Sequence, residues 1–135
     1  MDYYDGCPQF GGCPASDEVA RVYSPDKFYI VNLAPRKEGG SHWVLLFQDM
    51  YFDSFGVPPP LAIKPYVGRW NNTHFQDFHS AACGFYCIYV ADNLLAGRAP
   101  EGDLAPDDET DYNEQVLREY FDHRIGKGFF PPANK

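Results

Sequence analysis

The sequence predicts a small α+β domain in which an antiparallel or mixed sheet packs on one buried central helix. Short segments rich in β-forming residues are separated by turn residues over 27–55. The stretch 81–96 is apolar on nearly all sides, which is typical of a helix that is buried all round. A length of 135 residues suits a single domain with its own core, so we expect one domain over 1–135.

The N-terminal third is expected to pass from irregular chain into a strand. Residues 1–15 are rich in Gly, Pro and Cys, which favours an irregular segment. Ser16 is placed to cap a short helix that reaches Tyr23, with two acidic residues in its first turn. The segment 27–34 is rich in β-forming residues and is predicted to be the first strand.

Two further strands are predicted at 42–47 and 50–55. Only Gln48-Asp49 separates them, which indicates a tight hairpin. The three prolines within 56–60 are expected to end that sheet edge. The segment 65–72 has no clear pattern, and 73–78 alternates weakly as a further strand would.

Two helices follow in the C-terminal half. The buried helix over 81–96 is expected to stop at Gly97. An acidic loop is predicted over 98–110. Asp111 and Glu114 have the spacing of a capping box, and apolar residues then recur at helical spacing. This last, amphipathic helix is expected to end at Gly126.

The charge balance restricts the partners and the compartment. There are 19 acidic and 11 basic residues, a net charge of −8, and seven of the acids lie within 101–114. Nucleic acid is therefore not the expected partner, because phosphate binding requires clustered Lys and Arg. No apolar stretch is long enough to span a membrane, and the first residues lack a signal peptide's apolar core. We expect a reducing compartment rather than secretion, with all four cysteines reduced.

One cysteine has a position that favours reactivity. Cys83 precedes Gly84 and the helical run, and a thiolate at a helix N-terminus is stabilised by the helix dipole. Cys87, one turn further, is expected in the core. Cys7 and Cys13 lack a matching His pair, so we expect no metal site. The alternatives are that Cys83 is a buried thiol without function, or that it pairs with Cys87 on a metal.

A candidate base and its partner follow from the hairpin. With a two-residue turn at 48–49, the numbers of facing residues sum to 97, so His42 faces Phe55 and Asp53 faces Val44. These four residues share one face of the sheet, and His42 and Asp53 become diagonal neighbours. A carboxylate there would fix the imidazole tautomer and stabilise its charged form. The alternative is that Asp53 is an ordinary acid at a strand edge.

Three segments resemble motifs of the adenovirus protease (adenain) family of cysteine endopeptidases. Residues 76–87, Gln-Asp-Phe-His-Ser-Ala-Ala-Cys-Gly-Phe-Tyr-Cys, resemble its active-site segment, in which a Gln lies seven residues before the Cys of S-A-A-C-G. Gly-Gly-Ser-His-Trp at 39–43 resembles its G-G-x-H-W motif. Tyr-Phe-Asp-Ser-Phe-Gly at 51–56 resembles its L-F-E-P-F-G motif, with Asp for Glu. With smaller matches, the resemblance covers about residues 24–125 in the order His, acid, Gln, Cys.

The resemblance implies a fold, an activity and a set of site residues. It implies an adenain-like protease domain whose buried helix carries the catalytic cysteine at its N-terminus. The implied catalytic residues are Cys83 as nucleophile, His42 as general base, Asp53 as the residue that orients His42, and Gln76 as oxyanion donor. The expected walls of a narrow substrate cleft are Trp43, Phe55 and Phe85. No cofactor and no metal are implied.

The implied function is cleavage of viral capsid or core precursors during maturation, in the host nucleus or cytoplasm and in the virion. The adenovirus enzyme has a cysteine that bridges to an activating peptide, whereas 57–75 here contains none, so no disulfide-linked peptide is expected. DNA activation is not expected at a charge of −8. One alternative is a protease acting on ubiquitin-like modifiers, although the Gln–Cys interval of seven favours the viral branch over the SUMO proteases, which typically have six. The other is a non-catalytic binding module on the same fold.

Overall fold

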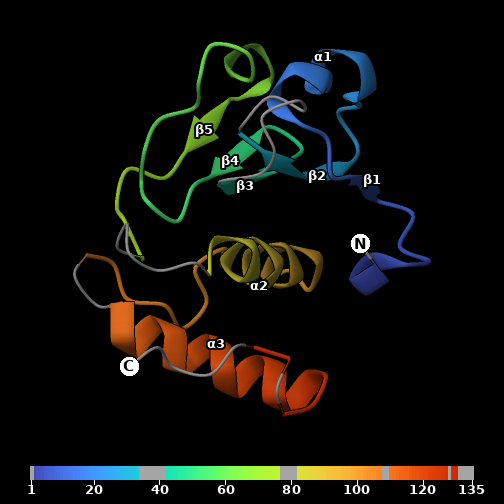
Figure 1. Ribbon diagram of the computed structural model, residues 1–135. Coiled ribbons are helices and arrows are strands. Elements are labelled where there is room, and N and C mark those ends of the chain that lie inside the picture. The colour runs from blue at the N-terminus through green and yellow to red at the C-terminus, as the bar shows by residue number, and fades with distance from the viewer. Residues whose placement is uncertain (1, 34–41, 77–81, 108–109, 128, 131–135) are drawn as a thin grey trace.

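A mixed five-stranded sheet forms the middle layer of an α+β fold (Figure 1). The computed structural model describes residues 2–33, 42–76, 82–107, 110–127 and 129–130. The strands lie in chain order, as β1 (Phe10–Gly12), β2 (Phe28–Asn32), β3 (Trp43–Phe47), β4 (Met50–Phe52) and β5 (Arg69–Trp70). The pairs β2–β3 and β3–β4 are antiparallel, whereas β1 and β5 pair in parallel with β2 and β4.

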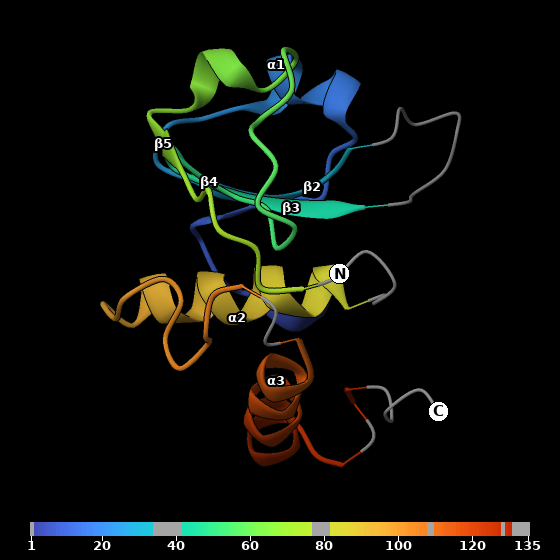
Figure 2. The ribbon, with the colours of Figure 1, turned by 90° about the vertical axis from the view of Figure 1, so that its left-hand side faces the viewer.

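Helices cover both faces of this sheet. The helix α2 (Cys83–Leu95) crosses one face, and α3 (Thr110–Arg124) packs on the far side of α2 (Figure 2). The opposite face carries α1 (Val19–Val22) and the segment that contains the 3-10 helix η4 (Lys64–Tyr66). Burial on both faces explains why the central strands are runs of apolar residues rather than alternating ones.

Alternate strand residues feed two separate cores. Ile30, Leu45 and Phe52 face α2, where they join Tyr86 and Val90 among others in the larger apolar cluster. A smaller cluster on the other face is built from the intervening strand residues, with Val19 and Ile63 from the covering segments. The helix α2 is thus buried on most of its surface, as the sequence predicts, and this fixes its first residue against the sheet.

The predicted hairpin is confirmed in register. Gln48 and Asp49 form the two-residue turn, and Leu45 pairs with Phe52, as a sum of 97 requires. Gln48 adopts a φ of 55°, a left-handed conformation that primed hairpin turns use. The strand predicted over 50–55 ends earlier, at Phe52, because Gly56 N–H closes a turn onto the carbonyl of Asp53 at 2.8 Å.

The N-terminal segment departs from the prediction. Residues 1–15 were expected to be irregular, yet they include the 3-10 helix η1 (Asp2–Tyr4) and strand β1. Ser16 begins the 3-10 helix η2 (Ser16–Glu18) and does not cap it, because its hydroxyl donates to Leu33 O at 2.8 Å. The short predicted helix is a turn of η2 followed by α1.

Three more expectations concern the second half of the chain. The unpatterned segment 65–72 contributes β5, so β4 is not the sheet edge. Residues 73–76 form no strand, and the rest of 73–78 lies outside the described residues. The helix α2 ends before Gly97, whose φ of +75° suits a glycine after a helix.

Within the described part of the chain, no helix has the length and apolar character needed to cross a bilayer.

Candidate active site

The ends of three elements meet at one place. His42 immediately precedes β3, Asp53 immediately follows β4, and Cys83 is the first residue of α2. The hairpin brings the first two residues together, and α2 lies across the sheet face of Leu45 and Phe52 with Cys83 against the start of β3. Contact between Cys83 and the backbone of Trp43 marks this junction.

The imidazole of His42 is held by Asp53. His42 Nε2 donates to Asp53 Oδ1 at 2.7 Å, and the carboxylate is almost fully buried, with 1% of Asp53 exposed. The same oxygen accepts the Phe55 N–H at 2.8 Å. Because an ionised carboxylate can only accept, the Nε2 atom carries the proton, and the lone pair of a neutral imidazole lies on Nδ1. The predicted contact between His42 and Asp53 is present, although both residues lie just outside the strands and Val44, predicted on the same face, is buried in the cluster on the side of the sheet away from α2.

The second ring nitrogen is directed to the thiol side of the site. His42 Nδ1 is buried and has no regular hydrogen-bond partner among the described residues. Besides Asp53, the Cys83 thiol is the group that interacts electrostatically with this imidazole. Nε2 is occupied by Asp53, so Nδ1 is the atom available to exchange a proton with Cys83.

The interactions of Cys83 and His42 favour a thiolate on Cys83 and an imidazolium on His42. Burial raises the pKa of the Cys83 thiol, but its interactions with His42 and with the N–H of Trp43, 3.4 Å from Sγ, outweigh burial and lower it below the ordinary value. Burial lowers the pKa of His42, yet Asp53 and Cys83 together raise it to about 9. A thiol whose pKa is lowered, next to an imidazole whose pKa is raised, is the arrangement of an activated nucleophile.

No protein-family model matches the chain. No similar protein was found among curated sequences either. The chemistry of the site is therefore argued from its own geometry.

The two cysteines of α2 differ in environment although both contact Trp43. The Trp43 N–H donates to Cys83 Sγ, whereas the Cys87 thiol donates to the Trp43 carbonyl at 3.5 Å. Cys87 is fully buried, and burial raises its pKa well above the ordinary value. Cys87 is thus an inert core thiol, as predicted. Within the described residues, no group of three or more His, Cys, Asp or Glu side chains is arranged to hold a metal ion.

Gln76 is anchored beside the carboxylate segment. It is 1% exposed, and the hydroxyl of Ser54, the residue after Asp53, donates to Gln76 Oε1. This bond turns the carbonyl end of the amide toward Ser54, so the amide nitrogen forms the opposite end. Residues 77–81 between Gln76 and Cys83 lie outside the described part of the chain, and the oxyanion role of Gln76 remains a prediction.

An apolar cavity of about 320 Å³ lies beside Gly84, the residue after Cys83. Its lining comes from the N-terminal segment, β2, β3, the first turns of α2 and the C-terminal segment, and comprises Cys13, Ile30, Trp43, Gly84, Phe85, Ile88 and Phe129. Trp43 and Phe85, two of the three predicted substrate contacts, are among these residues. Phe55 is not: its ring instead stacks on His42, with centroids 4.3 Å apart.

Sequence reasoning missed several residues that complete the site. Ser54 and Asn71 hold Gln76 and Asp53, and Cys13 and Phe129 reach the apolar cavity from opposite ends of the chain. Ser54 alone stood within a recognised motif, the acid segment 51–56. The other three have no local pattern that indicates a role.

Proposed function

We propose that this protein is an adenain-like cysteine endopeptidase with Cys83 as nucleophile and His42 as general base. The observation that carries the proposal is the arrangement around one imidazole. Nε2 is bonded to the buried Asp53 at 2.7 Å, which leaves Nδ1 for the thiol at the N-terminus of α2. Such a chain of acid, imidazole and thiol is the requirement for nucleophilic catalysis by cysteine.

In the acylation step, the Cys83 thiolate attacks the scissile carbonyl carbon and forms a C–S bond, while the carbonyl oxygen becomes an oxyanion. The imidazolium of His42 then gives its Nδ1 proton to the amide nitrogen, the C–N bond breaks, and the amine leaves. In deacylation, Nδ1 takes a proton from water as its oxygen attacks the thioester, and loss of the C–S bond releases the acid. The Asp53 carboxylate holds the imidazole throughout.

The oxyanion requires fixed hydrogen-bond donors. The backbone N–H of Cys83 and the carboxamide nitrogen of Gln76 are the donors we propose. Support for Gln76 comes from its burial, from the Ser54 bond that fixes its amide, and from its place seven residues before Cys83. Donors that are positioned before the reaction need no reorganisation when charge develops.

The substrates we propose are viral capsid or core precursor proteins, processed in the host nucleus or cytoplasm and in the virion. The resemblance of residues 39–43, 51–56 and 76–87 to the adenain family supports this assignment. The cavity beside Gly84 is lined by apolar side chains and suits an apolar residue of the substrate. We propose no disulfide-linked activating peptide and no activation by DNA.

The experiment that tests the proposal is a profile of peptide-library cleavage by the unaltered protein, Cys83→Ala and His42→Ala. Both variants should lose several orders of magnitude of activity, because members of such a site act as a unit. Cys87→Ala serves as the matched control. Activity in Cys83→Ala at a tenth of the unaltered rate would refute the assignment. A parallel arm with a ubiquitin-like C-terminal probe separates precursor cleavage from modifier removal, and no reaction in either arm would favour the binding module.

A further inference from the structure

The carboxylate that holds His42 lies just beyond the sheet. The last described pair of β3 and β4 joins Leu45 to Phe52, so Asp53 has no strand partner in that ladder. β5 pairs with Met50 and Tyr51 and ends at Trp70, one residue before Asn71. The Asp53 carbonyl is held by the Gly56 N–H at 2.8 Å, whereas the Asp53 N–H needs an acceptor from outside this ladder.

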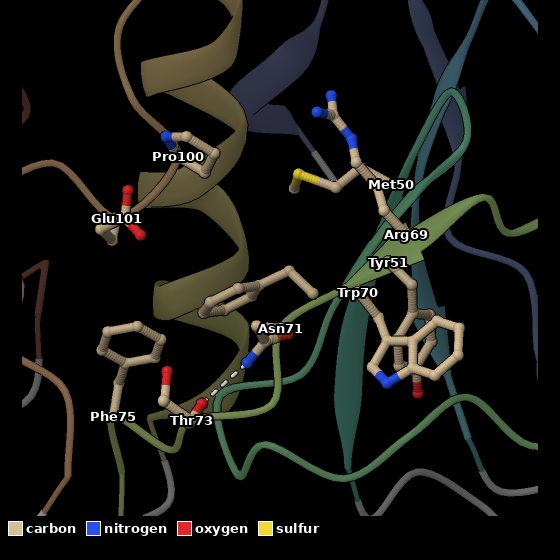
Figure 3. A pocket seen from close by; sticks show the side chains of 10 residues that line it. Met50, Tyr51, Arg69, Trp70, Asn71, Thr73, Phe75, Pro100 and Glu101 are labelled. Atoms are coloured by element: carbon tan, nitrogen blue, oxygen red, sulfur yellow. Dashed lines mark hydrogen bonds between the residues drawn. The ribbon is translucent and has the colours of Figure 1, made fainter.

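Asn71 provides that acceptor, and a donor as well, with a single carboxamide. Its Oδ1 accepts the Asp53 N–H at 2.9 Å, and its Nδ2 donates to the Asp53 carbonyl at 2.7 Å. Nδ2 also donates to the Thr73 carbonyl at 2.9 Å, the dashed contact in Figure 3. The amide group thus takes the place of a neighbouring peptide beyond the last β4–β5 pair, Tyr51–Trp70.

We infer that Asn71 is a positioning residue for the catalytic dyad, the pair formed by His42 and Cys83. It fixes the main chain of Asp53, Phe55 N–H fixes Oδ1 of the same residue, and Oδ1 fixes His42. A carboxamide carries both a donor and an acceptor, so the Asn71 side chain can bond the N–H and the carbonyl of Asp53 at once. This inference rests on the proposed function, because it concerns the imidazole that activates Cys83.

If Asn71 positions Asp53, its removal should change the ionisation of His42 and Cys83 as well as the stability of the fold. Without Asn71 the carboxylate is less firmly placed, so the pKa of His42 falls from about 9 toward its ordinary value and less Cys83 is thiolate near neutral pH. Each unit of pKa change corresponds to about a tenfold change in the ionised fraction.

The test is the pH dependence of Cys83 alkylation by iodoacetamide, with the modified peptide identified by mass spectrometry. Asn71→Leu and the smaller Asn71→Ala should react about tenfold more slowly at pH 6, and should match the unaltered protein above about pH 10, where a thiol ionises without help. Asn72→Leu is the matched control, since Asn72 is the same residue type one position further and is exposed. Rates at pH 6 within twofold of that control would overturn the inference.

A second measurement requires no variant. In the unaltered protein, the Asp53 amide proton should exchange with solvent slowly, because Asn71 accepts it. Fast exchange at that amide would overturn the inference even if the variants fail to fold. Neither readout uses peptide hydrolysis. A protein that alkylates as expected but cleaves no peptide would refute the proposed function and leave the positioning role intact.

Discussion

The imidazole of His42 lies flat against the ring of Phe55, with centroids 4.3 Å apart and planes inclined by 11°. The Phe55 N–H also donates to the Asp53 oxygen that holds His42. Phe55 therefore fixes the imidazole in two ways, since its backbone positions the acceptor and its ring covers one face of the base. Contact of an aromatic ring with an imidazolium adds an electrostatic attraction.

This stack predicts the effect of removing the ring. Phe55→Ala keeps the backbone donor and loses only the stacking, which is worth about 0.5–1.5 kcal/mol for an aromatic pair. We expect kcat for peptide hydrolysis to fall roughly three- to tenfold with KM nearly unchanged. Phe55→Tyr keeps an aromatic face and should retain activity. A loss confined to KM would instead support the contact with substrate that the sequence suggests.

The second prediction concerns pH. In His42→Ala the burial of Cys83 and the Trp43 N–H remain while the interaction with His42 is lost, so the pKa of the thiol should rise. Alkylation of Cys83 at pH 7 should fall more than tenfold and recover only in alkaline solution. In the unaltered protein, acid protonates the thiolate and lowers both alkylation and hydrolysis.

At alkaline pH, peptide hydrolysis and Cys83 alkylation should respond in different ways. As pH rises through about 9, His42 loses the proton that the leaving amine needs, so hydrolysis should decline while alkylation persists. Parallel measurements of both rates from pH 5 to about pH 11 test this. Hydrolysis that keeps rising above pH 10 would contradict the role of His42 as acid.

The third prediction concerns Gln76. Gln76→Ala should lower kcat by roughly 10²–10³, the usual cost of losing one oxyanion donor, with little change in KM. Ser54→Ala leaves the carboxamide present but removes the bond that orients it, so its effect should be smaller. Steady-state kinetics on one peptide measure both parameters. If Gln76→Ala loses activity through a higher KM rather than a lower kcat, Gln76 positions the substrate instead.

The sequence could predict the His42–Asp53 pair because a hairpin obeys simple geometry. A two-residue turn sets the register, and the register brings the start of β3 beside the end of β4, although the predicted face shared with Val44 is not observed. The buried helix was predictable for a similar reason, because an apolar run of helical length covers 81–96, and α2 is observed over Cys83–Leu95. In both cases the signal is local and spans few residues.

The missed features depend on contacts that no local pattern records. Asn71 meets Asp53 across 18 residues, and Ser54 meets Gln76 across 22. β1 forms in a segment of weak β-propensity, where Gly11 lets the ring of Tyr29 approach so closely that any side chain would overlap it. Tertiary packing, rather than propensity, creates this strand.

The fourth prediction uses Gly84, which separates Cys83 from Phe85 on the wall of the apolar cavity. A Cβ added at Gly84 would come no closer than 4.0 Å to Trp43, so Ala fits there without a clash. Gly84→Ala should raise helix stability by up to about 1 kcal/mol and yet raise KM, because the methyl group narrows the cavity. Urea unfolding and steady-state kinetics test the two effects separately. An unchanged KM would place the substrate elsewhere.

The last prediction concerns Asp92, far from the dyad on α2. Its carboxylate accepts the hydroxyls of Tyr4 at 2.9 Å and Tyr120 at 2.6 Å, as well as that of Tyr3, and lies 3.6 Å from Arg124. These partners come from η1 and α3, so one buried acid joins the N-terminal segment to both helices. Burial and then Asp92 raise the pKa of Tyr4, and the same two causes raise that of Tyr120 to about 12, so the hydroxyls stay protonated donors.

Asp92→Leu keeps the size of the side chain and removes the acceptor of the half-buried Tyr3 and Tyr120 hydroxyls, whereas the buried Tyr4 hydroxyl keeps the Ile88 carbonyl at 3.1 Å. Loss of an acceptor costs about 1–3 kcal/mol, so we expect the free energy of unfolding to fall by about that amount. Glu119→Leu, at an exposed position on α3, is the control and should change it by less than about 0.5 kcal/mol. Asp92 lies nine residues beyond Cys83, about 13 Å along the helix, so the variant should keep its rate of Cys83 alkylation at temperatures where it is folded. A stability loss below about 1 kcal/mol would show that solvent replaces the carboxylate and that the N-terminal segment is not held by this network.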